Sequence, residues 1–209
     1  MHYIFDMDGT LIDSMPAFCG AMIRFLDNNN IPYPHDIVKI VTPLGVIGSA
    51  RYFVDELKVD IPVDKICEIV LADMYAAYTT TIPAKDAVIP ALQKLKADGH
   101  SLSVLTASPH ITMDPCLKRL GIFDLFDFVW SCEDFGTTKS DINIYYEAAK
   151  KLGTTTSECI FLDDNPKVVS TAKKSGMTVY GVYDSSSEEY IDEMKQISDK
   201  YIYSFKELV

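Results

Sequence analysis

Acidic residues gather at two places in the sequence where apolar runs end. Asp6 and Asp8 follow one run near the N-terminus, and the adjacent pair Asp163 and Asp164 follows another. Carboxylates gathered without compensation repel one another and raise each other's pKa values. A shared divalent cation removes that conflict, and oxygen-only ligands without the spacing of an EF-hand loop favour Mg²⁺. The pattern therefore predicts a magnesium site.

Two other side chains could serve phosphoryl transfer at such a site. This chemistry needs positive charge on the transferring oxygens, and Lys139, after Gly136-Thr137-Thr138, is the best-placed cation. The hydroxyl of Thr106 could donate to the same oxygens. The sequence has no G-x-x-x-x-G-K-[ST] loop and no G-x-G-x-x-G turn after its first apolar run, so kinase and dehydrogenase functions lose their main support.

Substrate-binding candidates carry weaker signals. Ser108 and Asn165 could each bond a phosphate or simply cap the helix that follows. The segment 42–50 contains two glycines and is interpreted as a loop over the substrate, which makes the following Arg51 a specificity candidate. The alternative for Arg51 is an exposed arginine of a helix. We take Ser108 and Arg51 as the candidate substrate-binding residues.

The elements that must position these residues are short apolar runs rich in β-branched and aromatic residues, which predict buried strands. Helical patterns lie between the later runs and end at Gly153 and Gly176. This alternation predicts an α/β fold with a three-layer, Rossmann-like parallel sheet, whose strand ends would bring the polar residues together. The predicted strands are His2–Phe5, Ser101–Leu105, Phe126–Trp130, Cys159–Leu162 and Met177–Val182.

One interval interrupts the alternation of strands and helices. Roughly seventy residues after the first strand show amphipathic helix patterns and no convincing strand. We therefore expect a catalytic core of residues 1–14 and 86–209, with an α-helical cap inserted at 15–85. The two hinges would allow the cap to act as a lid. A last helix over Ser187–Lys200 and a short tail are expected to end the chain.

Composition limits the possible partners. The 209 residues, 48% of them hydrophobic, suit one compact core with a small satellite domain. A formal charge of -11 disfavours binding to nucleic acid or to anionic lipid. No apolar stretch approaches the roughly 20 residues that span a bilayer. We expect a cytoplasmic protein, a monomer or weak homodimer, without nucleic-acid or membrane partners.

Cysteine and histidine residues show no site pattern. The five cysteines are widely spaced and form no C-x-x-C pair, which predicts reduced packing residues. His35, His100 and His110 lack metal-ligand spacing and are predicted to be surface residues.

Taken in order, these motifs resemble those of the haloacid dehalogenase superfamily over essentially the whole chain. The segment from Asp6 to Leu11 resembles its first motif, Thr106 its second, Lys139 its third, and Asp163-Asp164 the paired-acid form of its fourth. The resemblance implies subfamily I, with a small α-helical cap, near the phosphoglycolate phosphatases and β-phosphoglucomutases. Two positions depart from the family pattern: Ser140 stands where proline often follows the lysine, and Asp86 where glycine is frequent.

The same resemblance implies roles for the acidic residues. Asp6 would be the nucleophile that forms an aspartyl phosphate, and Asp8 the general acid and base. Mg²⁺ would be surrounded by Asp6, the backbone carbonyl of Asp8, Asp163 and Asp164, while Lys139 would neutralise Asp6 and the phosphoryl group. An acid at Asp8 argues against the dehalogenases of the superfamily.

Three functions remain open from the sequence. The first is a Mg²⁺-dependent phosphatase that hydrolyses a small phosphorylated metabolite. The second is a sugar phosphomutase of the β-phosphoglucomutase type, which would share every motif. The third is a catalytically silent binding module of the same fold, against which the complete acid set argues.

Overall fold

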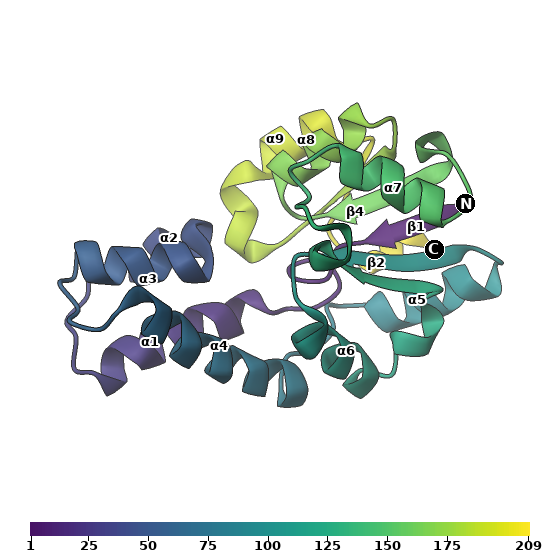
Figure 1. The fold of residues 1–209 in the computed structure, drawn as a ribbon. Coiled ribbons are helices and arrows are strands. Elements are labelled where there is room, and N and C mark those ends of the chain that lie inside the picture. The colour runs from purple at the N-terminus through teal and green to yellow at the C-terminus, as the bar shows by residue number, and fades with distance from the viewer. The chain divides into compact units, whose positions relative to one another are not determined.

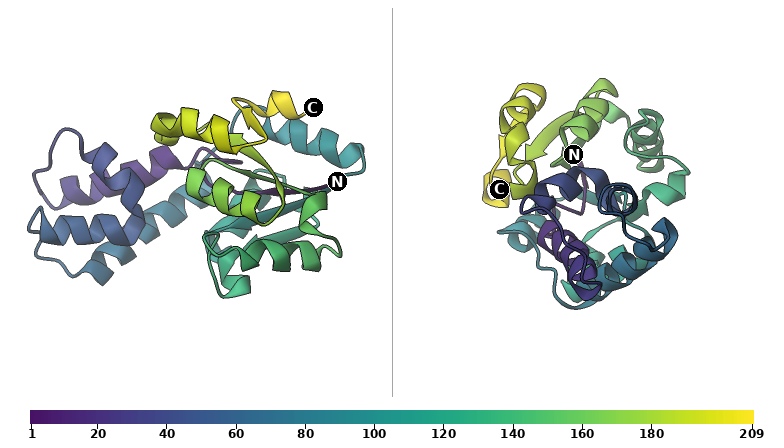
Figure 2. Two further views of the ribbon diagram at one scale, coloured as in Figure 1. Left: turned by 90° about the horizontal axis from the view of Figure 1, so that it is seen from above. Right: turned by 90° about the vertical axis from the view of Figure 1, so that its left-hand side faces the viewer.

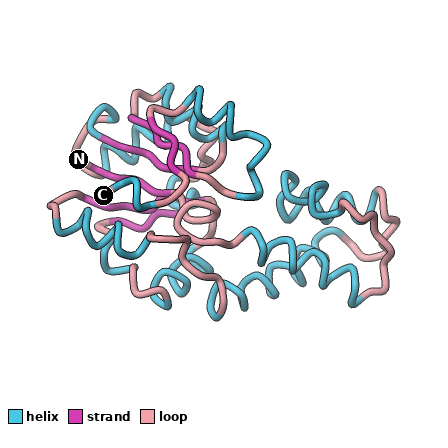
Figure 3. Tube along the Cα trace, turned by 180° about the vertical axis from the view of Figure 1, so that it is seen from behind, coloured by secondary structure: helices cyan, strands magenta, loops and turns pink.

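The chain folds into two compact units. The computed structural model describes residues 1–209, apart from the side chain of Pro43. One unit, here the sheet unit, comprises Met1–Asp13 and Pro83–Val209; the other, the helical unit, comprises Ser14–Ile82. The strands belong to the sheet unit (Figure 3), and both chain ends lie on it in the two views of Figure 2.

The sheet unit is built on six parallel strands in the order β3-β2-β1-β4-β5-β6. In this order β1 is central, and the chain crosses to β2 on one side and β4 on the other, so the order reverses beside the end of β1. The predicted fold class is confirmed. The strands are β1 (His2–Phe5), β2 (Ser101–Thr106), β3 (Phe128–Ser131), β4 (Cys159–Asp163), β5 (Thr178–Val182) and β6 (Lys200–Ile202).

Helices cover both faces of this sheet (Figure 1). One face carries α7 (Asn143–Lys151), α8 (Pro166–Lys174) and α9 (Ile191–Ile197), and the other carries α5 (Val88–Ala97) and α6 (His110–Arg119). Glycines end α7 and α8 as predicted, because Gly153 and Gly176 adopt φ of 71° and 92°. Short 3-10 helices span Phe123–Leu125, Cys132–Phe135, Thr156–Glu158, Ser185–Tyr190 and Phe205–Leu208.

A continuous apolar core fixes the central strands. All five residues of β4 are buried, as expected for a parallel strand with helices on both faces. Phe161 packs edge to face against the fully buried Tyr145 of α7, with ring centroids 5.2 Å apart. Burying one such aromatic side chain contributes about 2–3 kcal/mol, so the strand ends are held rigidly.

The helical unit has a core of its own. Its helices are α1 (Met15–Asn28), α2 (Ile37–Val41), α3 (Gly45–Asp55) and α4 (Val63–Thr80), with a 3-10 turn at Thr42–Leu44. The aromatic rings of Phe25 and Phe53 stack at 5.9 Å inside it. Among the described residues, no helix combines the length and apolar character needed to cross a membrane.

Two sequence-based expectations about these elements are wrong. The last helix ends at Ile197, and Lys200 lies in β6, because Asp199 exchanges backbone and side-chain hydrogen bonds with Val179 of β5 (2.8 and 2.9 Å). A strand of three residues is too short to show periodicity. The expected loop before Arg51 is mostly helix α3. Its Gly48 allows close packing, since a Cβ there would lie 2.9 Å from the Cβ of Leu44.

The residue before α5 adopts a strained backbone conformation. Ala87 has a φ of 61° and adopts the left-handed conformation. Its neighbour Asp86, which stands where the family often has glycine, does not. A Cβ in this region costs about 1 kcal/mol, whereas glycine adopts it freely.

We therefore expect Ala87→Gly to stabilise the protein. Relief of backbone strain in the folded protein outweighs the stabilisation of the unfolded chain by the greater freedom of glycine. We therefore expect the free energy of unfolding, measured by urea denaturation, to rise by about 0.5–1 kcal/mol. The control is Ala97→Gly, at an exposed helical position of α5, which should lower it by a similar amount. A decrease for both variants would contradict the assignment of strain to Ala87.

Candidate active site

The chain turns tightly directly after β1. The carbonyl of Met7 accepts hydrogen bonds from the N–H groups of Thr10, Leu11 and Ile12 at 3.3, 2.8 and 3.0 Å. Gly9 has a φ of 75°, and a Cβ there would lie 2.6 Å from Oδ2 of Asp164. Glycine is therefore required in this turn, both for its conformation and for the close approach of Asp164.

Three carboxylates and one ammonium form the centre of the site. Oxygens of Asp6, Asp163 and Asp164 lie within 4.8 Å of one another. Nζ of Lys139 lies 2.7 Å from Oδ1 of Asp6 and 2.7 Å from Oδ2 of Asp163. Lys139, Asp6 and Asp163 are all buried. The structure thus brings together side chains from the turn after β1, from the end of β4 and from the loop before α7.

The electrostatics of this cluster are unbalanced. Burial raises the pKa of Asp6 to about 7 against the attraction of Lys139, and the neighbouring Asp163 adds to the rise. The pKa of Asp164 is also raised well above its ordinary value, mainly by burial and next by repulsion from Asp163. Burial opposes the charged form of Lys139, but its two carboxylate partners outweigh this and raise its pKa. One ammonium does not neutralise three acids, so the donor set fits a divalent cation.

Residues after β2 orient Asp8. Thr106 is buried at the end of the strand, and its Oγ1 accepts a hydrogen bond from the N–H of Ser108 at 3.2 Å. The hydroxyl of Ser108 donates to Oδ2 of Asp8 at 2.6 Å. Helix α6 begins only after Pro109, so Ser108 contacts Asp8 instead of capping the helix. Neither sequence-based interpretation of Ser108 included this contact.

Backbone and hydroxyl groups hold the other acidic residues. Oδ1 of Asp163 accepts from the N–H of Asn165 at 2.8 Å, and the side chain of Asn165 caps α8, which confirms its capping interpretation. The hydroxyl of Tyr145 donates to the carbonyl of Lys139 at 2.7 Å. Oγ1 of Thr10 donates to Oδ1 of Asp164 at 3.2 Å. The orientation of these carboxylates is therefore fixed before any ligand binds.

His110, the first residue of α6, joins this helix to the 3-10 helix that follows β3. Its ring nitrogens lie 2.9 Å from carboxylate oxygens of Asp114 and Asp134. The pKa of His110 is raised, mainly by its hydrogen bond to Asp114 and next by its hydrogen bond to Asp134. The residue is partly exposed, and it connects two helical segments that follow neighbouring strands of the sheet.

Arg51 belongs to the helical unit. It lies within α3 and its side chain is exposed. Its role in substrate binding stays a prediction.

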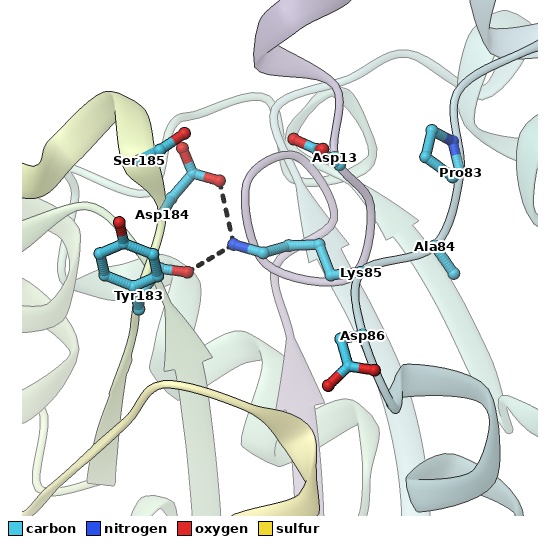
Figure 4. A pocket seen from close by; sticks show the side chains of 8 residues that line it. All are labelled: Asp13, Pro83, Ala84, Lys85, Asp86, Tyr183, Asp184 and Ser185. Atoms are coloured by element: carbon cyan, nitrogen blue, oxygen red, sulfur yellow. Dashed lines mark hydrogen bonds and ion pairs between the residues drawn. The ribbon is translucent and has the colours of Figure 1, made fainter.

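A cavity of about 250 Å³ lies within the sheet unit, beside the turn after β1 (Figure 4). Lys85 lies along one side of it and bonds to Asp184. Sequence reasoning missed both residues, and it assigned no role to Thr10. A single lysine in a linker carries no pattern, and the partner of Thr10 lies 154 residues away in the sequence.

Comparison with known proteins places this chain in a family. Residues 3–182 match the family of haloacid dehalogenase-like hydrolases. The chain is 27% identical over 198 residues to a validoxylamine A 7'-phosphate phosphatase of Streptomyces hygroscopicus subsp. limoneus, covering 91% of this chain and 89% of that one. It is 27% identical over 217 residues to a phosphoglycolate phosphatase of Colwellia psychrerythraea, covering 99% and 94%.

The fold also matches solved structures. The crystal structure of a β-phosphoglucomutase from Clostridium difficile superposes with a TM-score of 0.74 at 18% sequence identity, covering 100% of this chain and 92% of that one. At this identity the likeness concerns the fold alone. The family match over most of the chain confirms the resemblance found in the motifs. The protein is an enzyme that belongs to the haloacid dehalogenase-like hydrolase family, in which its curated relatives include phosphatases.

Proposed function

We propose that the protein is a Mg²⁺-dependent phosphatase of a small phosphorylated metabolite, with Asp6 as the nucleophile. The observation that carries this proposal is the buried cluster in which Lys139 lies 2.7 Å from Asp6, beside the carboxylates of Asp163 and Asp164. The two phosphatases named above, which match nearly the whole chain, support the same reaction class.

The reaction proceeds in two displacements at phosphorus. A carboxylate oxygen of Asp6 attacks the phosphorus, the bond to the leaving alcohol oxygen breaks, and Asp8 gives that oxygen its proton. A water molecule then attacks the aspartyl phosphate, Asp8 takes a proton from this water, and inorganic phosphate leaves Asp6. The contact from Ser108 holds Asp8 in place for both proton transfers.

The remaining residues neutralise charge. Asp6, Asp163, Asp164 and the backbone carbonyl of Asp8 would hold Mg²⁺, which stabilises negative charge on the phosphoryl oxygens when bound. Lys139, and the hydroxyl of Thr106, would contact these oxygens as well. The hydroxyl of Ser108 bonds Asp8, so this step requires no contact from Ser108 to the phosphoryl oxygens.

Substrate choice would depend on the helical unit. We propose that it acts as a lid and that Arg51 contributes to recognition of the substrate. A phosphomutase would use the same motifs, and it differs in delivering the phosphoryl group to a second hydroxyl instead of water. The experiment below separates the two reactions.

The first test is a screen of the purified protein against phosphorylated sugars, small acids and nucleotides, recording released phosphate and isomeric products. We expect phosphate release that requires Mg²⁺, stops with EDTA, and falls at least about 10³-fold in Asp6→Asn. The matched control is Asp124→Asn, an exposed aspartate of the sheet unit, which should keep full activity. Isomer formation without release would select the phosphomutase, and folded, metal-binding protein that acts on no compound would favour the silent module.

The raised pKa of Asp6 predicts that stabilisation by Mg²⁺ depends on pH. The folded-state pKa, about 7, lies above the ordinary value of 3.8, so Asp6 favours folding in its protonated form and loses that contribution as the pH rises through 7. Mg²⁺ competes with this proton. We expect Mg²⁺ to raise the Tm more at about pH 8 than at about pH 6. In Asp6→Asn the rise in Tm should differ less between the two pH values. An equal rise at both pH values in the unmodified protein, or an unchanged difference in Asp6→Asn, would contradict competition between Mg²⁺ and the proton.

The contact to Asp8 predicts a specific kinetic effect for Ser108→Ala. Without the hydroxyl, Asp8 loses its orientation, and we expect kcat to fall roughly tenfold, a fraction of what general acid–base catalysis contributes, with little change in KM. The control is Ser157→Ala, an exposed serine of the 3-10 helix before β4, whose hydroxyl bonds the hydroxyl of Thr155. A rise in KM with unchanged kcat would instead assign Ser108 to substrate binding.

A further inference from the structure

The segment before α5 pairs with the segment that follows the catalytic turn. The N–H of Asp13 donates to the carbonyl of Pro83, and the N–H of Lys85 donates to the carbonyl of Leu11, each at 3.0 Å. Ile12 and Ala84 form an antiparallel bridge between these bonds. The backbone of Lys85 is thereby fixed beside the turn that carries Asp8.

The ammonium of Lys85 joins three segments of the sheet unit. It donates to the carbonyl of Gly9 at 2.6 Å, to the carbonyl of Tyr183 at 2.5 Å and to Oδ2 of Asp184 at 2.9 Å. Figure 4 shows its side chain reaching across to Tyr183 and Asp184. The side chain of Lys85 is 17% exposed and that of Asp184 is 2% exposed. Since an ammonium has three N–H donors, each donor has its acceptor.

The acceptor at Gly9 links Lys85 to the acidic cluster. Gly9 is the residue whose Cα lies so close to Asp164 that no side chain fits between them, and Thr10, the next residue, donates to Asp164. A donor on the Gly9 carbonyl therefore fixes the peptide that joins these two contacts.

We propose that Lys85 is a positioning residue, which holds the Gly9–Thr10 peptide and through it keeps Asp164 in the geometry that binds the metal. This inference rests on the proposed metal-dependent function. Partners of this kind, one shell outside the ligands, typically change metal affinity by about 10–100-fold when they are removed.

The charges around Lys85 support a structural role over anion binding. The cavity beside it is lined by the carboxylates of Asp13, Asp86 and Asp184, and Lys85 is its one cation among the described lining residues. An anionic ligand would meet these acids and would have to displace bonds that the ammonium already makes. Lys85 also offsets the charge of Asp184, which acts unfavourably on the ionised form of Asp164.

The test measures metal affinity directly, by electron paramagnetic resonance with Mn²⁺ as the probe, on the full chain. Lys85→Met keeps the length of the side chain and removes its charge. The matched control, Lys206→Met, removes the ammonium that pairs with Asp86 at 3.0 Å on the exposed surface. Amide hydrogen exchange of residues 7–12 is measured on the same samples, because a role confined to global stability would not loosen this turn selectively.

We expect Lys85→Met to weaken Mn²⁺ binding about tenfold or more, with faster exchange in the turn. Lys206→Met should stay within about twofold of the unmodified protein. Unchanged affinity in Lys85→Met would overturn the inference while leaving the phosphatase proposal intact. An unmodified protein that neither binds Mn²⁺ nor hydrolyses phosphate esters would overturn both.

A second variant covers the case in which Lys85→Met fails to fold because Asp184 is left buried without its partner. The double variant Lys85→Met, Asp184→Asn removes both charges and retains an oxygen for the bonds from Ser186. It still lacks the donor to Gly9. Weakened Mn²⁺ binding in this folded variant supports positioning through Gly9, and affinity equal to that of the unmodified protein contradicts it.

Discussion

The structure of the site depends on keeping carboxylates buried beside one ammonium. Asp6, Asp163 and Asp164 lie within 4.8 Å of one another, and Lys139 bridges the first two at 2.7 Å. Such a cluster has a high electrostatic energy in a low-dielectric interior, and it persists only where the surrounding fold is rigid. The apolar strands provide that rigidity, because Asp6 follows the buried end of β1, and Asp163 and Asp164 lie at the end of β4, whose residues are all buried. A change that loosens the sheet would therefore also disturb the positions of these carboxylates.

The arrangement of the strands explains why the candidate site lies at this edge of the sheet. With β1 central, its carboxyl end lies between the ends of β2 and β4, and three loops meet over one strand terminus. The carboxylates of Asp6 and Asp8 follow β1, the hydroxyl of Ser108 follows β2, and the carboxylates of Asp163 and Asp164 lie at the end of β4. Contacts between the loops then fix the groups, as between Ser108 and Asp8 and between Thr10 and Asp164. A tight turn around Gly9 makes these contacts possible.

Sequence patterns predicted the elements that are long and periodic. Five strands and the helices that end at Gly153 and Gly176 follow from apolar runs and stop signals, whereas β6, with three residues, gives no such pattern. The rule that polar residues at the ends of parallel strands converge predicts the acidic cluster, because this rule depends on strand topology alone. It does not lead to Lys85, whose partners lie in turns that are brought together only by the folded chain. The two glycines of segment 42–50 predict a loop, because glycine is common in flexible segments. In the structure Gly45 instead begins α3 and Gly48 allows close packing, and the sequence alone does not distinguish these roles from flexibility.

For the proposed phosphatase, the charge of the site also constrains the order in which metal and substrate would bind. A phosphate ester is an anion, and it approaches a protein of net charge -11 whose site contains more carboxylates than cations. Lys139 is already engaged by Asp6 and Asp163, so it alone attracts a phosphoryl group weakly. A divalent cation held by the same carboxylates would reverse the local field at the point where the phosphoryl oxygens bind. In the proposed function, affinity for the substrate would thus be coupled to occupancy of the metal site. Residues that shape that site without contact to the substrate would then affect substrate binding through the metal.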